Sequence, residues 1–208
     1  MYKRQGILFS DGNTSFSANS TVTVGNLVIG NLAPFATSIN FAEAVKVTAA
    51  DSSPTVSALT VNALSTGTIT FAKTIEVTNA AASIDIGSVN GLITVTGNIT
   101  GKDNVSITTS GSGSITLSGA ISTDAADGDI FIESTTGNVI TSGAIFTSGT
   151  ASGNNSADIN IDTATSGNIT IGGNVSTSGG GDIFLGADSV TAASGTGCLL
   201  YTSPSPRD

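Results

Sequence analysis

The nine residues Gly113-Ser-Ile-Thr-Leu-Ser-Gly-Ala-Ile121 hold the pattern that decides the fold of this chain. Branched aliphatic residues alternate with Ser and Thr between two glycines, so one face of a short strand is apolar and the other is polar. Related nonamers begin at other glycines along the chain, namely Gly67, Gly91, Gly137 and Gly167. Repetition of one short strand predicts a repeat architecture.

A second alternating segment lies between consecutive nonamers. Its copies are Ile84-Asp-Ile86, Val105-Ser-Ile107, Ile130-Phe-Ile132, Ile159-Asn-Ile161 and Ile183-Phe-Leu185. Each period, of 24, 22, 24 and 30 residues in turn, therefore holds at least two strands joined by Gly, Asn and Ser corners. Residues 41–47 have some helical propensity, but the alternation around them favours a strand.

Recurrence of the same strand once per period favours a coil over an array of hairpins. We expect an all-β fold, a single right-handed parallel β-helix of about eight coils, each of roughly 22–30 residues, with no appreciable helix. Tandem immunoglobulin-like sandwiches are the runner-up, although their usual unit of about 100 residues is not visible. In the coil, one column runs Ile93, Ile115, Val139, a second Val95, Leu117, and a third Ile99, Ile121, Ile145.

The two ends of the chain differ from its Ser-, Thr-, Gly- and Val-rich middle. Residues 1–5 and 198–208 can be encoded by one short DNA sequence read in opposite directions, as expected of a translated sequencing adapter. We therefore expect residues 6–66 to be native solenoid with degenerate repeats and residues 67–197 to be solenoid with clear repeats. The native termini would then be missing, so the lack of a signal peptide or anchor is uninformative.

Composition excludes several classes of partner. The stretch from Gly6 to Gly197 has three lysines, Lys46, Lys73 and Lys102, against fourteen acids, a net charge of −11, and it lacks His, Cys and Arg. Nucleic acids and anionic membrane surfaces both need basic residues. No apolar run approaches the roughly 20 residues that span a bilayer.

The runs Gly113–Thr123 and Gly167–Thr177 resemble repeats of large bacterial β-helical proteins, above all filamentous-haemagglutinin-like adhesins and autotransporter passengers. The resemblance covers mainly residues 67–192. It implies a structural or adhesive stalk on the outer cell surface or in the extracellular space, with host cells, glycans or other copies of the chain as partners. Two alternatives stay open: a glycan- or ice-binding solenoid, and a β-helical polysaccharide lyase or hydrolase whose active site lies outside this chain.

Few residues are candidates for chemistry, and we expect no enzymatic activity, no catalytic residue, no cofactor and no metal ligand. The densest acidic group, Asp124, Asp127, Asp129 and Glu133, offers oxygens to calcium but lacks EF-hand spacing, so solvated turn residues are the favoured interpretation. The segment 179–185 resembles a calcium-binding nonapeptide repeat, yet it occurs once.

Register suggests a further role for three aspartates. Asp129, Asp158 and Asp182 each precede the second strand of consecutive periods, so stacked coils would place them about 4.8 Å apart. Because opposed like charges are destabilising, we expect these carboxylates either to splay or to be bridged by a weakly held cation such as calcium.

Three outward features complete the predictions. Alternation points Phe131 and Phe184 outward, where cover by a loop is favoured over exposure. The insertion 147–157 is expected to form a loop on one face, and a tolerated insertion is favoured over a binding loop. Thr-x-Thr pairs such as Thr94/Thr96 would match an ice lattice only at constant coil length, so the varying period argues against an ice-binding face.

Overall fold

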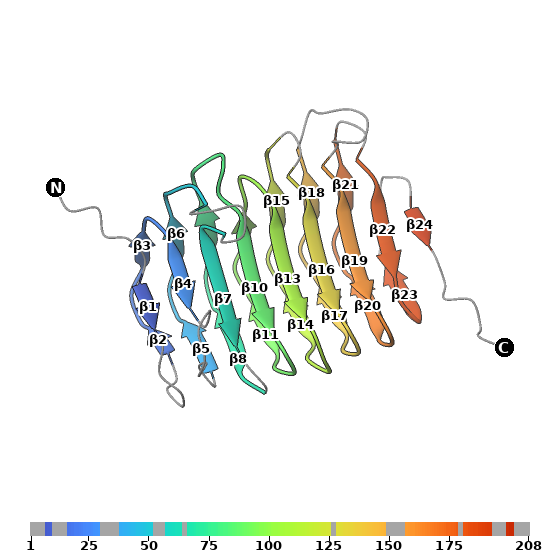
Figure 1. Ribbon diagram of the computed structural model, residues 1–208. Coiled ribbons are helices and arrows are strands. Elements are labelled where there is room, and N and C mark those ends of the chain that lie inside the picture. Colours follow the sequence, from blue (N-terminus) through green and yellow to red (C-terminus); the bar gives the residue numbers. More distant parts are fainter. Residues whose placement is uncertain are drawn as a thin grey trace.

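The computed structural model describes residues 7–9, 16–29, 38–51, 57–63, 66–125, 128–148, 157–178, 181–192 and 199–201. These residues form three parallel sheets, wound by the chain into a right-handed β-helix (Figure 1). No helix occurs among them, and residues 45–47 are in a strand, so the predicted fold is confirmed. Parallel pairing throughout rules out the immunoglobulin-like alternative, which needs antiparallel sheets.

Each complete coil contributes one strand to each sheet. Sheet A has nine strands: β1 (Ile7–Phe9), β4 (Leu27–Ile29), β7 (Leu59–Ala63), β10 (Ile84–Ser88), β13 (Val105–Thr109), β16 (Ile130–Ser134), β19 (Ile159–Thr163), β22 (Ile183–Gly186) and β24 (Leu199–Tyr201). Sheet B has eight: β2 (Phe16–Ala18), β5 (Ser38–Phe41), β8 (Thr68–Phe71), β11 (Ile93–Val95), β14 (Ile115–Leu117), β17 (Val139–Thr141), β20 (Asn168–Ile171) and β23 (Ser189–Ala192). Sheet C has seven: β3 (Val22–Val24), β6 (Val45–Val47), β9 (Ile75–Val77), β12 (Ile99–Thr100), β15 (Ile121–Thr123), β18 (Ile145–Thr147) and β21 (Val175–Thr177).

The three sheets run through the degenerate and the clear repeats alike. The predicted register is confirmed, because Ile93 pairs with Ile115 and Ile115 with Val139 in sheet B, while Ile99 pairs with Ile121 in sheet C. β24 lies in the segment expected to come from adapter and pairs with β22. Its pairing uses only backbone groups, so the origin of this segment stays a prediction.

Within the clear repeats up to Ile169, coil length varies mainly at the C-to-A corner, because from sheet A to sheet B the chain advances nine residues, as from Ile84 to Ile93, or ten, as from Val105 to Ile115. From the first inward residue of sheet B to that of sheet C the chain advances six residues in every coil, as from Ile93 to Ile99. From sheet C to sheet A it advances six residues to Val105, nine from Ile121 to Ile130, and fourteen from Ile145 to Ile159. The insertion 147–157 thus lies at the C-to-A corner, where residues 149–156 are outside the described part of the chain.

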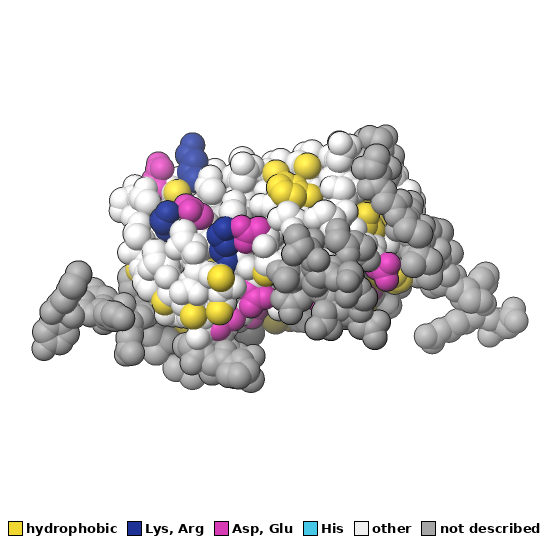
Figure 2. All heavy atoms as spheres, turned by 90° about the horizontal axis from the view of Figure 1, so that it is seen from above, with side chains coloured by type: hydrophobic (Ala, Val, Ile, Leu, Met, Phe, Trp, Pro, Cys, Tyr) yellow, Lys and Arg dark blue, Asp and Glu magenta, His cyan; other side chains and the backbone are white. Residues whose placement is uncertain are grey.

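The outer faces of the sheets differ in charge. Sheet C carries Lys46 beside Glu76, and seen from above, the Lys side chains gather toward the N-terminal end next to acidic ones (Figure 2). Sheet A carries Asp85, Glu133 and Asp162 at outward positions. In sheet B the outward position within the strands is occupied by uncharged residues in every described coil, mainly Thr and Asn.

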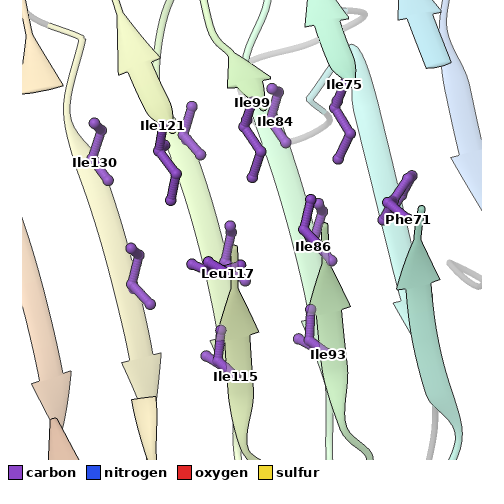
Figure 3. Packing of buried hydrophobic residues seen from close by; sticks show 14 of the residues in the cluster. Phe71, Ile75, Ile84, Ile86, Ile93, Ile99, Ile115, Leu117, Ile121 and Ile130 are labelled. Carbon is purple, nitrogen blue, oxygen red and sulfur yellow. The ribbon is translucent and has the colours of Figure 1, made fainter. Parts of the chain in front are cut away.

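The interior is one continuous core of aliphatic side chains. From Leu27 to Ala187 the inward aliphatic residues of the three sheets form one buried cluster, in which Ile86, Ile93 and Ile115 pack together (Figure 3). Phe41 and Phe71 are neighbours in the same column, with ring centroids 4.6 Å apart and planes 6° from parallel. Burial of each such side chain contributes roughly 1.5–3 kcal/mol, and each needs the coils on either side to bury it.

Glycines line two corners because successive coils approach too closely for a side chain. A Cβ on Gly113 would lie 2.2 Å from the carbonyl oxygen of Gly91, and one on Gly119 would lie 2.2 Å from that of Gly97. The two glycines of the nonamer are therefore packing positions that set the distance between coils.

Polar side chains also point inward, at the ends of strands. Ser134 Oγ donates to the Gly113 carbonyl, 2.8 Å away, and accepts from the amide of Gly137. Thr147 Oγ1 donates to the Ala157 carbonyl at 2.9 Å. These hydroxyls satisfy backbone groups where the chain turns from one sheet to the next, which keeps buried polar groups paired.

Thr141 breaks this rule. Sheet B strands read Ile-Thr-Val at β11 and Ile-Thr-Leu at β14, but β17 reads Val-Ile-Thr. The exchange leaves Ile140 38% exposed and buries Thr141 at 2% exposure, with no hydrogen-bond partner for its Oγ1. An unpaired buried hydroxyl costs about 1–3 kcal/mol.

Replacement of Thr141 by Val should therefore stabilise the chain by roughly 1–2 kcal/mol, because it removes the unpaired hydroxyl at constant volume. Thr147→Val in the same coil is the matched control and should destabilise, since it leaves the Ala157 carbonyl unpaired. Urea unfolding followed by circular dichroism measures both. Equal effects of the two substitutions would show that hydrogen bonding does not distinguish these sites.

Candidate functional site

A column of side chains with acceptor oxygens precedes the strands of sheet A. Asn104, Asp129, Asp158 and Asp182 stand in successive coils immediately before β13, β16, β19 and β22. The backbone amide of each donates to the side-chain oxygen of the preceding one: Asp129 N to Asn104 Oδ1 at 2.9 Å, Asp158 N to Asp129 Oδ1 at 2.8 Å, and Asp182 N to Asp158 Oδ1 at 2.7 Å. We call these four residues the corner column.

Toward the N-terminus the acceptor of this corner comes from elsewhere. The equivalent place before β7 is held by Ala58, which has no side-chain oxygen. Asp51 supplies it, because its Oδ1 accepts from the amides of Ala58 at 2.6 Å and Ser83 at 2.8 Å. Its Oδ2 accepts from Ser83 Oγ at 2.7 Å. A side-chain oxygen therefore accepts from the corner amide before β7, β10, β16, β19 and β22.

Two carboxylates of the corner column have backbone amides as hydrogen-bond partners. The expected register is confirmed, but an amide of the next coil donates to Asp129 and Asp158, a partner that the prediction of splayed or cation-bridged carboxylates did not consider. A carboxylate that accepts a charge-assisted hydrogen bond from a backbone amide is stabilised without a cation. The bridging cation remains untested.

The acidic group between β15 and β16 is divided among different roles. Asp124 forms an ion pair with Lys102, Asp129 belongs to the corner column, and Glu133 lies on the outer face of sheet A. Asp127 is outside the described residues. Among those that are described, no three Asp, Glu, His or Cys side chains gather as a metal site would require. In the segment 179–185, Asp182 belongs to the corner column and Ile183 begins β22.

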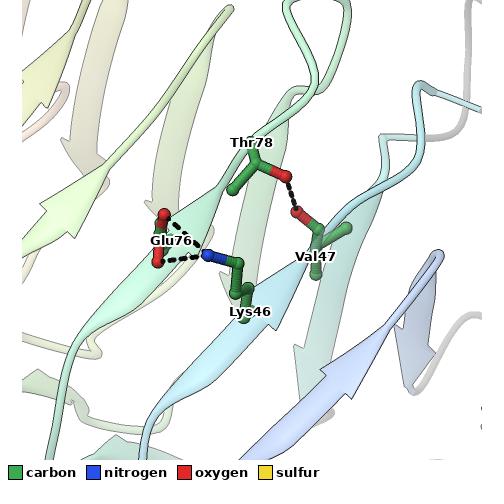
Figure 4. Close-up of polar contacts among 4 residues, drawn as sticks. All are labelled: Lys46, Val47, Glu76 and Thr78. Carbon is green, nitrogen blue, oxygen red and sulfur yellow. Dashed lines mark hydrogen bonds and ion pairs between the residues drawn. The ribbon is translucent and has the colours of Figure 1, made fainter.

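The ion pairs lie on sheet C and its corner. Lys46 Nζ is 3.1 Å from both carboxylate oxygens of Glu76 on the neighbouring strand, beside the hydrogen bond from Thr78 Oγ1 to the Val47 carbonyl (Figure 4). Both charged side chains are 41% exposed, so the pair adds little stability. Both ion pairs join residues of neighbouring coils, and the fold does not depend on them.

The two outward phenylalanines stand in one column of sheet A. Phe131 pairs with Asn160, and Asn160 pairs with Phe184, on β16, β19 and β22. Both rings are half-buried, so the structure supports neither full exposure nor complete cover. Asn160 Oδ1 between them is buried without a hydrogen-bond partner. Sequence alternation found the rings but could not show that Asn160 separates them.

Two outward carboxyls of sheet A are desolvated. Burial raises the pKa of Asp85 above its ordinary value. Burial also raises the pKa of Asp162, and a hydrogen bond from the backbone of Thr163 partly offsets this. Asp162 neighbours Glu133 in register, which places two acids side by side on one face.

Three outward threonines of sheet B stand in one column. Thr70, Thr94 and Thr116 pair directly on β8, β11 and β14. These threonines stay in register although the period varies, because the extra residues enter at the corners between sheets. The column of threonines is then interrupted by Ile140.

None of the described residues belongs to a helix long and apolar enough to cross a bilayer.

Substitutions of Asp158 should separate hydrogen bonding from charge. Asp158→Asn keeps an acceptor oxygen, as Asn104 does in the same column, and should leave the melting temperature within a few degrees of the native value. Asp158→Ala leaves the Asp182 amide without its partner and should cost about 1–2 kcal/mol. Melting curves of both variants with calcium and with a chelator test the cation. A large calcium-dependent gain that Asp158→Asn abolishes would favour the bridging cation.

Asp85→Asn should stabilise the chain at neutral pH and lose that advantage in acid. Because the folded pKa of Asp85 is raised, its protonated form favours folding below the unfolded pKa of about 3.9, and that contribution is lost as pH rises through the folded pKa. Urea unfolding at pH 7 and pH 3.5 measures the difference between variant and native chain. An advantage of Asn that is as large at pH 3.5 as at pH 7 would contradict desolvation as the cause.

Comparison with known proteins gives no relative: no protein-family model, curated protein or solved structure matches this chain.

Proposed function

We propose that this chain is a structural or adhesive stalk segment of a large secreted or cell-surface bacterial repeat protein, and that it is not catalytic. The observation that carries the proposal is the stack itself, in which three parallel sheets share one core from Leu27 to Ala187. Such a stack extends by about 4.8 Å for each added coil, so it holds its ends apart at a distance set by the number of coils.

The use of its acidic residues supports a scaffold over an enzyme. Asp51, Asp129 and Asp158 accept hydrogen bonds from backbone amides at a corner, and Asp124 pairs with a lysine. General acid–base catalysis instead needs carboxyls directed at a substrate, one of them with its pKa near the working pH. In the proposed stalk, partner binding falls to corner insertions or to outward faces of the sheets, which can change while the core does not.

A modular stalk should tolerate removal of a whole coil. Deletion of residues 91–112 joins Asn90 to Gly113, which stands in the register place of Gly91, so every inward column closes again. We expect this variant to keep the circular dichroism of a β protein and a single cooperative melting transition. Deletion of residues 91–101 is the control, because it removes a sheet B and a sheet C strand without a sheet A strand and should abolish cooperative melting.

Display on a bacterial surface tests the stalk itself. With an epitope fused beyond residue 192, the intact chain should expose the epitope to antibody, and so should the whole-coil deletion. The half-coil deletion should not. Turnover of any member of a polysaccharide panel by the purified chain would contradict a non-catalytic stalk.

A further inference from the structure

The outer face of sheet A between β16 and β22 carries two rings with an amide between them. Phe131, Asn160 and Phe184 pair in register across three strands. Neighbouring strands are about 4.8 Å apart, so the two ring positions lie about 9.6 Å apart along the axis, one on each side of Asn160.

A second row of the same face brings carboxylates alongside. Glu133 pairs with Asp162, and Asp162 pairs with Gly186. Because Gly186 has no side chain, its neighbours lean over it: Asp162 Oδ1 and Phe184 Cε1 lie 2.5 Å and 2.9 Å from the point where a Cβ would be. A carboxylate oxygen and a ring edge therefore meet above this glycine.

The polar groups of this patch are poorly compensated where they stand. Asn160 Oδ1 is buried and unpaired, which is costly for an amide oxygen. Glu133 and Asp162 are like charges on adjacent strands, an arrangement that is destabilising by itself. Burial raises the pKa of Asp162, so its charge is poorly solvated. Each of these costs would be lowered by a bound cation with hydrogen-bond donors.

Among the described residues, no lysine or arginine lies in the coils that carry the patch. Between Asp103 and Asp188 the sequence contains nine Asp and Glu residues and neither Lys nor Arg. The lysine nearest in sequence, Lys102, forms its ion pair with Asp124. A complementary charge would therefore come from another molecule.

We propose that the patch formed by Phe131, Glu133, Asn160, Asp162 and Phe184 binds the ammonium group of a lysine side chain on a partner polypeptide. An ammonium has three donors, enough for the amide oxygen and two carboxylates, and aromatic ring faces attract cations. Calcium fits less well, because it needs six to eight oxygen ligands and the rings occupy the flanks. A polypeptide is favoured over a free amine because small ligands bind in concave sites, whereas this is the outer face of a sheet.

Titration of the ¹⁵N-labelled full chain with a capped Gly-Ser-Lys-Ser-Gly peptide tests the site. Amide signals of β16, β19 and β22 should shift and those of sheet B should not. The same peptide with acetylated lysine, at equal ionic strength, should cause no shift, because acetylation removes the charge. Binding is independent of the stalk function, so either proposal can fail alone.

Variants locate the interaction within the patch. Phe131→Thr/Phe184→Thr should raise the Kd for the lysine peptide about fivefold or more, and Thr already occupies the Phe131 column at Thr60. Asn160→Leu should weaken binding similarly. Ser106→Ala/Thr108→Ala on β13, in the same two columns, is the control and should leave the Kd unchanged.

Three outcomes would overturn the proposal: equal binding of the acetylated peptide, an unchanged Kd in the double phenylalanine variant, or stronger binding of calcium chloride than of the peptide with the same shifts. Melting curves of each variant confirm that the coils remain folded.

Discussion

Each inward side chain of this β-helix must lie directly against its counterpart in the next coil, and the rest of the structure depends on that contact. Parallel pairing in register aligns Ile with Ile and Val with Leu through sheets B and C, so burial is shared between neighbours and no coil is buried alone. The glycine corners follow from it, because coils close enough for aliphatic contact leave no space for a Cβ. So do the hydroxyl and carboxylate acceptors, which pair the backbone where the chain leaves one sheet for another.

Local departures from this arrangement are informative because the stack tolerates them. Thr141 carries an unpaired hydroxyl into the core, yet Leu117 before it and Ile171 after it keep the register. Ala58 lacks a side-chain oxygen, and Asp51, which lies earlier in the same corner, supplies the acceptor. One coil can therefore contain an unfavourable residue, because the neighbouring coils supply enough stability to offset its free-energy cost.

The sequence predicted the parts of this molecule that repeat at a constant offset. The nonamer is recognisable because the first inward residue of each sheet C strand follows that of the sheet B strand by six positions. This constant offset made the pairing of Ile93 with Ile115 predictable. The hydrogen bonds of the corner column were not foreseen. The recurrence of Asp129, Asp158 and Asp182 was visible, but the amide that each acidic side chain meets depends on the geometry of the turn. The patch on sheet A was visible only in part, because 29 residues separate Phe131 from its neighbour Asn160 and the intervening insertion hides their contact.

Concentration of the largest length differences at the C-to-A corner has a consequence for how such a chain can diverge. Position along the axis is counted in coils, not in residues, so a segment inserted at this corner moves nothing above or below it. Loops of different size that leave the corner of different coils would project from one edge at fixed multiples of the strand spacing. The corner loops can thus be lengthened, shortened or exchanged while the axial spacing of the coils stays the same.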